Sequence, residues 1–522
     1  MLNPENEDVV VCHDIVVVGG GFSGAATALL LKRRCPERRV IVIERSVHFD
    51  RKVGESTTEI SSCFMVRMLG IGTYLANEHL PKQGLRFWFD RTGEESFDTC
   101  GEIGPKFQVR LPAFQIDREK IDSHLLTLAE EAGCEVWRPA KLVDFSYGSA
   151  GVSLTVERDG TKETLSAAWL VDASGRAAVS ARKSGNFELA TEHPTSALWA
   201  RFTGVTDIDG DAMRNAHPAC VQASGALRGL ATNHLAGRGW WCWIIPLRGG
   251  DTSVGLVYDQ RLFDPERLSG ANLGEKLVNH LLTHPVGRLL FKNAKPMPGD
   301  VKAYSNLAFR SKRIAAPGCI QVGDASGFMD PLYSSGLDYA AFGISHTVNL
   351  IRNHPTPATA TTDLEKMNDG FRVSFEMWLE AIYKDKYHYI GDADLMSAAM
   401  LMDVGCFFIG PVRSLYIDHE AGFLDFPYSG VIGGAVGKFM KLYNRRLAAI
   451  AQRRHALGHY GLHNLNRREL YPGFGPGASA LPLLFRGIRK WIRAEWDTFW
   501  MRPARHPEPA AEIPVSRPTT VS

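Results

Sequence analysis

The chain of 522 residues is 45% hydrophobic and 22% charged, the composition of an ordinary folded protein. Intrinsic disorder, collagen-like repeats and a coiled coil are therefore excluded as the main architecture. The 59 Lys+Arg and 57 Asp+Glu nearly cancel, so the molecule as a whole is not expected to bind nucleic acid.

Cysteine usage and the first residues favour a cytoplasmic protein. The nine cysteines form no C-x-x-C pair, which indicates a reducing compartment, and we predict no metal site. The N-terminus is acidic, unlike the basic start of a signal peptide. No apolar run approaches the length of roughly eighteen residues that predicts a membrane-spanning helix.

The first predicted unit is a strand over 14–18, a glycine turn, a helix and a second strand over 39–45. The turn reads Gly19-x-Gly21-x-x-Gly24. The first glycine permits a tight turn, the second lets the backbone approach a pyrophosphate, and the third lets helix and strand pack closely. The pattern predicts a dinucleotide site, with a purely structural glycine turn as the alternative.

Acidic residues after three strands refine this prediction to FAD rather than NAD. Glu44 ends the second strand, twenty residues after Gly24, where a carboxylate accepts ribose hydroxyls. Asp172 and Asp324 lie in two later strand-end turns. Asp324 can hydrogen-bond the ribityl hydroxyls, which only a flavin carries. An ordinary strand-end turn is the alternative for each.

The remaining pattern predicts an α/β fold with a Rossmann-type FAD-binding domain. A helix is expected over 117–132, strands over 150–172 and 196–260, and helices over 363–500. We expect a discontinuous FAD-binding domain (1–180 plus 310–345), an inserted mixed β-sheet substrate domain (181–309), a helical C-terminal region (346–502) and a disordered tail (503–522).

Positive charge is concentrated near the C-terminus. Residues 441–505 contain 13 Lys+Arg and three Asp+Glu. This segment is either a solvated helical face or a docking surface for an acidic partner. Within it, 481–502 carries three tryptophans and several basic residues, which predicts an amphipathic helix that lies on a membrane or covers a cavity.

Four stretches resemble the flavin-dependent halogenases, a family within the single-Rossmann flavoprotein monooxygenase-like class. They are the glycine motif; Gly54-Glu55-Ser56-Thr57; Trp241-x-Trp243-x-Ile245-Pro246; and Gly323-Asp324-Ala325 through Phe328, Asp330-Pro331-Leu332 and Ser334-Ser335-Gly336. The Trp-x-Trp-x-Ile-Pro stretch is the specific one. The resemblance covers roughly residues 1–345, and within the family it is closer to halogenases of carrier-bound or phenolic substrates.

The resemblance implies that FADH2, O2 and a halide ion generate hypohalous acid. It assigns cofactor binding to Gly19, Gly21, Phe22, Ser23, Gly24, Glu44, Arg45, Glu55, Ser56, Arg118, Asp172, Gly323, Asp324 and Pro331. It assigns halide binding to the backbone N–H groups of Ser335 and Gly336, at a helix start. Trp241 and Trp243 are then expected to keep the substrate away from the flavin. Without the resemblance they would be two core aromatics on one face of a strand.

The resemblance also assigns a catalytic lysine. Lys82 stands in a Lys-x-Gly-x-x-Phe stretch like the one that carries the family's essential lysine, although Phe89 and Asp90 depart from the pattern. A desolvated lysine has a lowered pKa and can attack hypohalous acid as a neutral amine. An exposed loop lysine is the alternative. The assignment requires an enclosed passage between the flavin and this amine.

The expected function is halogenation of an electron-rich phenol or pyrrole by an enzyme of secondary metabolism. Tyr333 stands where free-tryptophan halogenases carry a glutamate, which argues against tryptophan as the substrate. A separate flavin reductase is expected, because no second nucleotide motif is present. The substrate is expected free or on an acidic acyl carrier protein, and peripheral membrane contact is a further expectation. The alternatives are an aromatic hydroxylase, an isoprenoid-type flavin reductase and a flavin-binding protein without catalysis.

Overall fold

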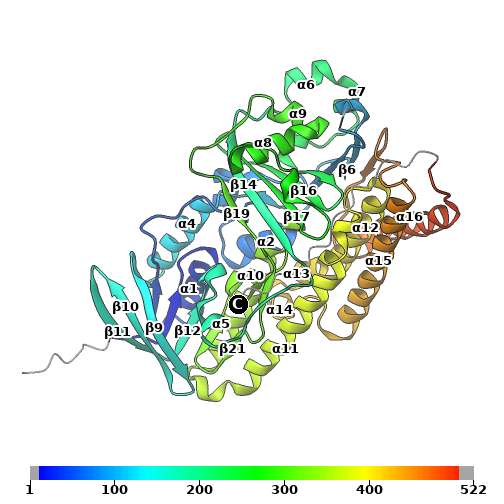
Figure 1. The fold of residues 1–522 in the computed structure, drawn as a ribbon. Helices are drawn as coiled ribbons and strands as arrows, with labels where there is room; N and C mark the ends of the chain where they lie inside the picture. Colours follow the sequence, from blue (N-terminus) through cyan, green and yellow to red (C-terminus); the bar gives the residue numbers. More distant parts are fainter. Residues whose placement is uncertain (1–10, 94, 505–522) are drawn as a thin grey trace, which may run out of the picture.

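The computed structural model of the protein describes residues 11–93 and 95–504, so residues 505–522 of the predicted tail lie outside the described residues. Three larger sheets and the helices that cover them form the molecule (Figure 1). The glycine motif lies near one end of the molecule, and the C-terminal helices lie at the other.

A six-stranded sheet forms the N-terminal core. In its central strand β2 (Ile15–Val18) every residue is buried, which is why the run is apolar throughout instead of alternating. β2 pairs in parallel with β3 (Val40–Ile43) and β12 (Trp169–Asp172). The strand order is β21 (Ala315–Ala316), β22 (Cys319–Gln321), β12, β2, β3 and β8 (Glu135–Trp137).

Helices cover one face of this sheet and a second sheet covers the other. Ile15 and Val17 belong to the core that includes α1 (Phe22–Arg34), α4 (Arg118–Glu131) and α10 (Gly336–Asn353). Val16 and Val18 pack instead against a four-stranded sheet. Its order is β1 (Val11–Cys12), β11 (Thr161–Ala167), β10 (Gly151–Arg158) and β9 (Lys141–Gly148).

The largest sheet contains the Trp-x-Trp strand β16 (Trp240–Pro246). Trp241, Trp243 and Ile245 face the main core, whereas Cys242 and Ile244 pack toward α8 (Leu273–Thr283) and α9 (Pro285–Phe291). The strand order is β18 (Lys295–Pro296), β14 (Thr195–Thr203), β17 (Thr252–Asp259), β16, β15 (Thr232–Gly237), β5 (Leu85–Phe89), β6 (Gly101–Pro105) and β24 (Arg468–Tyr471), with β19 (Lys302–Tyr304) beside β14.

This sheet draws on more of the chain than the 181–309 segment of the sequence-based division. β5 and β6 come from the N-terminal part, and β24 comes from the segment that was expected to be helical. β24 forms a strand because it completes the sheet edge, pairing in parallel with β6 from Arg468 opposite Glu102 to Tyr471 opposite Pro105. A tertiary pairing partner therefore overrides the local pattern.

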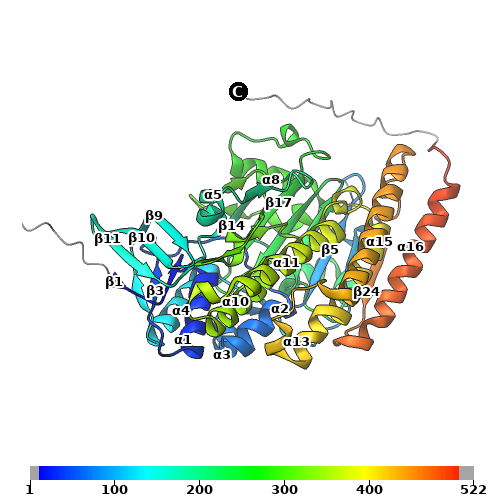
Figure 2. The same cartoon turned by 90° about the horizontal axis from the view of Figure 1, so that it is seen from below.

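The helical C-terminal region packs against this sheet and against α10. Its main helices are α11 (Thr361–Trp378), α12 (Ala393–Phe407), α13 (Arg413–Ile417), α15 (Gly430–Ala456) and α16 (Leu481–Trp500), and two short helices, α2 (Glu59–Cys63) and α3 (Gly72–Glu78), lie closer to the N-terminal core. Figure 2 shows α15 and α16 side by side, with α16 outermost. Among the described residues one helical stretch, Ala393–Ile417, is long and apolar enough to cross a membrane, and 72% of its most apolar window is buried inside the protein.

Candidate active site

The glycine turn between β2 and α1 requires residues without side chains at two positions. Gly19 has a φ of +101°, and a Cβ there would lie 2.4 Å from the carbonyl oxygen of Ala173. A Cβ on Gly24 would lie 1.8 Å from the carbonyl oxygen of Gly19. Gly21 precedes the first turn of α1, whose N–H groups have no intrahelical acceptor and can bind a phosphate. This local geometry fits the pyrophosphate of a dinucleotide.

A cleft, here called the glycine cleft, opens beside this turn. Gly19, Gly21, Glu44 and Arg45 line it together with the 173–175 turn. Glu44 is buried, and its carboxylate accepts hydrogen bonds from the backbone N–H groups of Gly20 at 2.6 Å and Ser46 at 2.8 Å. These bonds fix the carboxylate at the end of β3, where the sequence predicted the ribose.

Four other predicted cofactor residues lie behind the cleft or close to it. Phe22 is buried beneath the guanidinium of Arg118, and a Cβ on Gly323 would lie 2.2 Å from the Ser23 hydroxyl, so two distant turns meet here. Asp172 is not among the residues that line the cleft or the two cavities described below. Its carboxylate accepts hydrogen bonds from the N–H and hydroxyl groups of Ser180 and from the backbone N–H of Ser174.

A second hollow, here called the tryptophan cavity, contains most of the other residues that the resemblance assigned to the flavin. It is lined by Glu55, Ser56, Arg118, Trp199, Trp241, Trp243, His234, Asp324, Phe328, Pro331, Ser334 and Gly336, among others. The lining is mostly apolar and aromatic, and Glu55, Ser56, Arg118 and Asp324 add polar groups to it. This combination suits a flat ring system with polar edges.

Hydrogen bonds orient the two tryptophans of β16. The Trp241 indole N–H donates to the Tyr387 hydroxyl at 2.8 Å, and that hydroxyl donates to Asp330 at 2.9 Å. The Trp243 indole N–H donates to Ser253 at 3.2 Å. Trp243 also lies over Gly255, where a Cβ would be 2.3 Å from its ring. Both rings are thereby held on one wall of the cavity.

Charged residues on the other walls are paired with one another. Arg201 bridges Glu55 at 2.7 Å and Asp117 at 2.9 Å. Arg118 donates to Asp122 and to the backbone carbonyl of Val53, which fixes the segment that carries Glu55. Burial raises the pKa of both Glu55 and Asp324.

Lys82 lies in a third hollow, here called the lysine cavity. The side chain is only 4% exposed, and its Nζ donates a hydrogen bond to the backbone carbonyl of Thr57 at 2.7 Å. Burial lowers the pKa of Lys82 to about 8, against the influence of Glu59 and Asp338. The cavity is lined by Thr57, Thr58, Glu59, Lys82, Leu85, Pro105, Tyr333, Ser335, Asp338, Trp378, Asp403, Phe407 and Phe474, among others.

The lysine cavity and the tryptophan cavity share two walls. Along the chain from 53 to 59, Glu55 and Ser56 line the tryptophan cavity and Thr57 and Glu59 line the lysine cavity. The residues along 331–338 are divided between the two hollows, with strict alternation from Tyr333 to Gly336. Within this stretch Tyr333 and Ser334 have positive φ angles of 66° and 63°. Lys82 is therefore buried beside the predicted flavin region and does not point into bulk solvent. Among the described residues the two hollows have no lining residue in common, so the enclosed passage that the assignment of Lys82 requires stays a prediction.

The predicted halide residues stand at this shared wall. Ser335 lines the lysine cavity and Gly336 lines the tryptophan cavity, directly at the N-terminus of α10. The first N–H groups of a helix lack intrahelical acceptors, so this position can receive an anion. The Ser335 hydroxyl is 2.7 Å from the Tyr383 hydroxyl, which itself donates to the carbonyl of Leu332 at 3.0 Å.

Several site residues were not predicted from the sequence. Asp338 is fully buried beside the lysine cavity, and one of its carboxylate oxygens accepts from Thr58 and Ser61. Burial raises the pKa of Asp338 to about 7 and also raises that of Glu59. On the opposite wall Asp403 accepts hydrogen bonds from Tyr333, Lys386 and Tyr443. The sequence feature that could have identified Asp338 is its place as the one acidic residue of the otherwise largely apolar α10.

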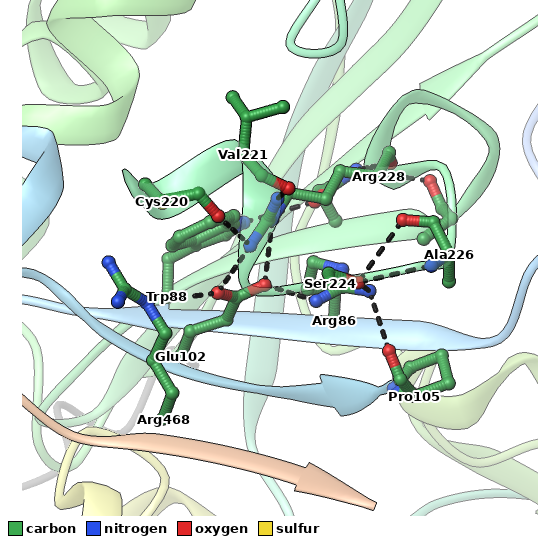
Figure 3. A network of polar contacts seen from close by, with 12 residues as sticks. Arg86, Trp88, Glu102, Pro105, Cys220, Val221, Ser224, Ala226, Arg228 and Arg468 are labelled. Atoms are coloured by element: carbon green, nitrogen blue, oxygen red, sulfur yellow. Dashed lines mark hydrogen bonds and ion pairs between the residues drawn. The ribbon is translucent and has the colours of Figure 1, made fainter. Parts of the chain in front are cut away.

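A buried ionic network (Figure 3) adjoins the lysine cavity at Pro105. Glu102 on β6 pairs with Arg86 of β5 and with Arg228, and all three side chains are nearly inaccessible to solvent. Burial opposes ionisation of Glu102, but the two guanidinium groups hold its pKa below the usual value. Arg86 also donates to the carbonyl of Pro105 at 3.0 Å, so the network fixes a residue that lines the cavity.

Comparison with known protein families identifies the family to which the chain belongs. The family model described as "Tryptophan halogenase" matches residues 14–111 and 106–389, which include the residues that line the glycine cleft and the tryptophan cavity, together with Lys82. The chain belongs to the tryptophan halogenase family.

Individual relatives agree with this membership of the tryptophan halogenase family. The chain is 25% identical over 392 residues to the flavin-dependent halogenase chlA of Dictyostelium discoideum, which covers 69% of this chain and 62% of that protein. It is 27% identical over 278 residues to the tetracycline 7-halogenase of Kitasatospora aureofaciens, covering 50% and 47%. The matches thus span about half to three fifths of the length of these relatives.

Solved structures confirm the predicted α/β fold for this member of the tryptophan halogenase family. Halogenase PltM superposes with a TM-score of 0.72 at 16% identity, covering 92% of this chain and 96% of that one. The flavin-dependent brominase Bmp2 superposes with a TM-score of 0.62 at 19% identity, covering 84% and 100%.

Proposed function

We propose that this protein is an FAD-dependent halogenase that acts on an electron-rich aromatic ring, either a phenol or a pyrrole. The observation that supports this proposal most strongly is the position of Lys82. The amine is buried in a cavity whose walls also form the tryptophan cavity, and its pKa is lowered to about 8. A buried amine beside an enclosed oxidation site can carry an electrophile to a second molecule.

FAD fits the residues that are present. The α1 turn with Gly19, Gly21 and Gly24 would hold the pyrophosphate, Glu44 the ribose, and the tryptophan cavity the flavin ring. When bound in its reduced form, FADH2 would supply two electrons and the halide ion two more, so that O2 is reduced to hypohalous acid and water. Among solved relatives, halogenase PltM is known in complex with phloroglucinol and FAD.

The protein's own residues then control where the oxidant goes. The backbone N–H groups of Ser335 and Gly336 hold the halide at the shared wall. Trp241 and Trp243, fixed by their indole hydrogen bonds, prevent an aromatic substrate from reaching the flavin region. The substrate is therefore confined to the lysine cavity, away from direct oxygenation.

Lys82 transfers the halogen within the lysine cavity. Its neutral Nζ attacks the halogen of hypohalous acid, which forms an N–halogen bond and releases water. The ring then attacks the halogen, and the N–halogen bond breaks with its electron pair on nitrogen. The nitrogen takes up one proton, which restores the amine, and the ring loses one. Glu59 is partly exposed in the same cavity and has a raised pKa, so it is placed to accept that proton.

The substrate class follows from the residues around Lys82. Tyr333 replaces the glutamate of free-tryptophan halogenases, and its hydroxyl is engaged by Asp403 at 3.0 Å. The glutamate that polarises an indole is therefore absent from this position, and the carboxylate beside it, Asp403, is engaged by Tyr333, Lys386 and Tyr443. Phenols and pyrroles need no such activation. Relatives of this chain include a sulochrin halogenase and a tetracycline 7-halogenase beside a tryptophan 2-halogenase, so the assignment depends on Tyr333 and not on the relatives.

Product analysis tests this proposal. The holoenzyme is incubated with FAD, a flavin reductase, NADH and bromide, together with free and carrier-loaded phenols and pyrroles, and products are analysed by mass spectrometry. Brominated products that require O2 and the reductase are expected. Hydroxylated products would identify an aromatic hydroxylase, turnover without O2 a reductase of double bonds, and bound FAD without any turnover a flavin-binding protein.

Two kinds of partner follow from the proposal. A separate reductase supplies FADH2, since the sequence contains a single strand–glycine–helix nucleotide motif. For substrate delivery, the basic segment 441–505 suits an acidic acyl carrier protein or an anionic membrane. Several of its charges are already neutralised inside the chain, because Arg446 pairs with Glu495, and Arg486 and Lys490 pair with Glu469.

Charge reversal within residues 441–505 tests whether a carrier protein delivers the substrate to this segment. If a carrier protein docks on 441–505, replacing exposed arginines there by glutamate raises the KM for a carrier-bound substrate and leaves that for a free substrate unchanged. An unchanged KM for both would exclude carrier docking at this segment.

A further inference from the structure

The outward face of α16 exposes large apolar side chains along its whole length. Phe485 is 55% exposed, Ile492 60%, Trp496 67%, Phe499 61% and Trp500 64%, with Leu481 at the start of the helix at 37%. These positions recur at helical spacing, so they form one continuous stripe over about 30 Å. The stripe is named here the α16 stripe and consists of these six residues. Soluble monomers rarely expose a continuous apolar surface of this kind.

The opposite face of the same helix is the one that packs on the protein. Leu483, Gly487, Ala494 and Thr498 are buried. A Cβ on Gly487 would lie 2.6 Å from a side-chain carbon of Met402, so α16 lies close against α12. The α16 stripe therefore does not arise from a helix that is loosely attached or wrongly rotated. It is a second apolar face that the fold leaves uncovered.

Basic residues flank the stripe and extend over α15. Arg489 and Arg493 lie on one side of it, and Lys438, Arg445 and Arg453 are exposed on α15. α15 contains no acidic residue. The two acidic residues of α16 are engaged, Glu495 with Arg446 and Asp497 with Arg493. The surface formed by the two helices is therefore apolar in its centre and positive at its border.

We propose that the α16 stripe is a membrane-contact surface, on which α16 lies parallel to an anionic bilayer with its apolar side chains among the lipid headgroups. Tryptophan and phenylalanine with bordering arginines are the residues that such interfacial helices use. The arginines contribute attraction to anionic lipid, which is the charge complement of this border. The proposal does not depend on the halogenation chemistry, because none of these residues lines a hollow of the candidate site.

A second copy of the chain explains the surface less well. Arg486, Arg489 and Arg493 lie on the same side of the stripe. If two stripes paired antiparallel about a two-fold axis, the exposed Arg489 of each copy would fall on the same side of the interface and repel the other. An anionic bilayer can bind both the apolar centre and the positive border of the surface, and it does not bring like charges of two copies together.

Membrane contact would place the lysine cavity close to the lipid. α16 packs on α12, and Val404 and Phe407 of α12 line that cavity. The two helices are in close contact at Gly405 of α12, where an added Cβ would lie 3.0 Å from the Cβ of Leu484 of α16. An apolar aromatic substrate dissolved in the membrane would therefore be separated from the lysine cavity by two helices, α16 and α12.

Vesicle binding by the full-length holoenzyme tests the proposal. Co-sedimentation is measured with vesicles of phosphatidylcholine alone and of phosphatidylcholine with phosphatidylglycerol, at low and high salt. We expect binding to the mixed vesicles, at least about tenfold stronger than to the neutral ones and weakened by salt. Brominated lipid should quench tryptophan fluorescence on binding, and this quenching should decrease in a Trp496→Ser, Trp500→Ser variant.

Matched variants locate the contact. Phe485→Ser with Ile492→Ser and Trp496→Ser removes the centre of the stripe and should reduce vesicle binding at least about tenfold. Val143→Ser with Leu189→Ser replaces exposed apolar residues outside α15 and α16 and should leave binding unchanged. Should the stripe variant fold poorly, Lys438→Glu with Arg489→Glu provides a second test and should abolish the preference for anionic vesicles.

The remaining outcomes overturn the proposal. No binding of the wild-type protein to either vesicle, or equal loss in the stripe and control variants, would do so. A dimer in light scattering that dissociates in the stripe variant without vesicle binding would assign the surface to a second copy, and stripe-dependent binding of an acyl carrier protein alone would assign it to that partner. Halogenation of a water-soluble substrate is measured in parallel, so failure of the proposed activity is distinguished from failure of membrane contact.

Discussion

Lys82 is held between burial, which favours the neutral amine, and two nearby carboxylates, which favour the ammonium. Burial has the larger influence and lowers the pKa to about 8, with Glu59 and Asp338 acting in the opposite direction. Near this pH about half of the molecules contain a neutral amine. The reactivity of this residue is therefore a property of its surroundings, and it can be changed without removing the lysine.

Replacing Lys82 by alanine should abolish halogenation and leave the earlier steps intact. The amine touches no residue of the glycine cleft, so flavin binding, FADH2 oxidation and release of hypohalous acid into solution are expected to continue. The halogenation rate should fall at least about a hundredfold. The measurement is product formation beside trapping of free hypohalous acid. Halogenation that survives in the variant would remove Lys82 from the mechanism.

The halogenation rate should rise with pH and level off above about 8, because only the neutral amine of Lys82 attacks hypohalous acid. Single-turnover rates across this range, with reduced FAD supplied chemically, isolate the step from the reductase. A rate that falls over the same range would show that the ammonium acts instead, as a hydrogen-bond donor.

A matched pair of variants tests whether the pH dependence of the halogenation rate arises from Lys82. Glu59→Gln removes a carboxylate that raises the lysine pKa, so the midpoint should move below 8. Glu78→Gln removes an equivalent charge from an exposed position on α3 and should leave the midpoint unchanged.

At the level of elements, the β2–α1 connection depends on close approach of backbone to backbone. Gly24→Ala would put a Cβ 1.8 Å from the Gly19 carbonyl oxygen, so the helix must shift, at a cost of about 1–3 kcal/mol or more. We expect loss of bound flavin and a lower melting temperature. Gly343→Ala on α10 is the control, since nothing lies within 4 Å of its Cβ position. It should retain flavin and gain up to about 1 kcal/mol.

Elements with strong local patterns could be predicted from the sequence. The predicted helix over 117–132 is α4 (Arg118–Glu131), with Asp117 as its cap, and the strands over 196–260 are present. β5 was missed because nearly all of its residues are buried, on both faces, so its sequence does not alternate. β24 was missed because its pairing partner β6 lies more than 350 residues earlier in the chain.

The candidate site also contains some residues that could be predicted from the sequence and others that could not. Motif residues such as Gly19, Glu44 and Trp241 could be assigned because a short segment carries the whole signal. Asp338 and Glu59 could not, since their importance arises only where two distant segments form the walls of one cavity. The geometry of Asp172, whose carboxylate is fully engaged by Ser174 and Ser180, also depends on a turn that the motif does not specify.

At the scale of the whole molecule, the C-terminal segment completes the sheet that supports the active site. A chain ended after residue 467 lacks β24 and α16, which leaves the edge of β6 and a face of α12 uncovered. We expect this truncation to aggregate or to lose flavin, as measured by size-exclusion chromatography and bound-flavin absorbance. A chain ended after residue 504 retains all described elements and should behave as the full-length protein. Normal folding of the shorter chain would show that β24 is dispensable.

The pairing of β24 with β6 also restricts how the protein emerges from the ribosome. β6 is synthesised early, yet its neighbour at the sheet edge is added only after some 360 further residues. Until then, the nascent chain displays an open strand edge to other chains in the cell. Chaperone capture during translation would therefore be expected to protect yield far more than any help given to the finished polypeptide.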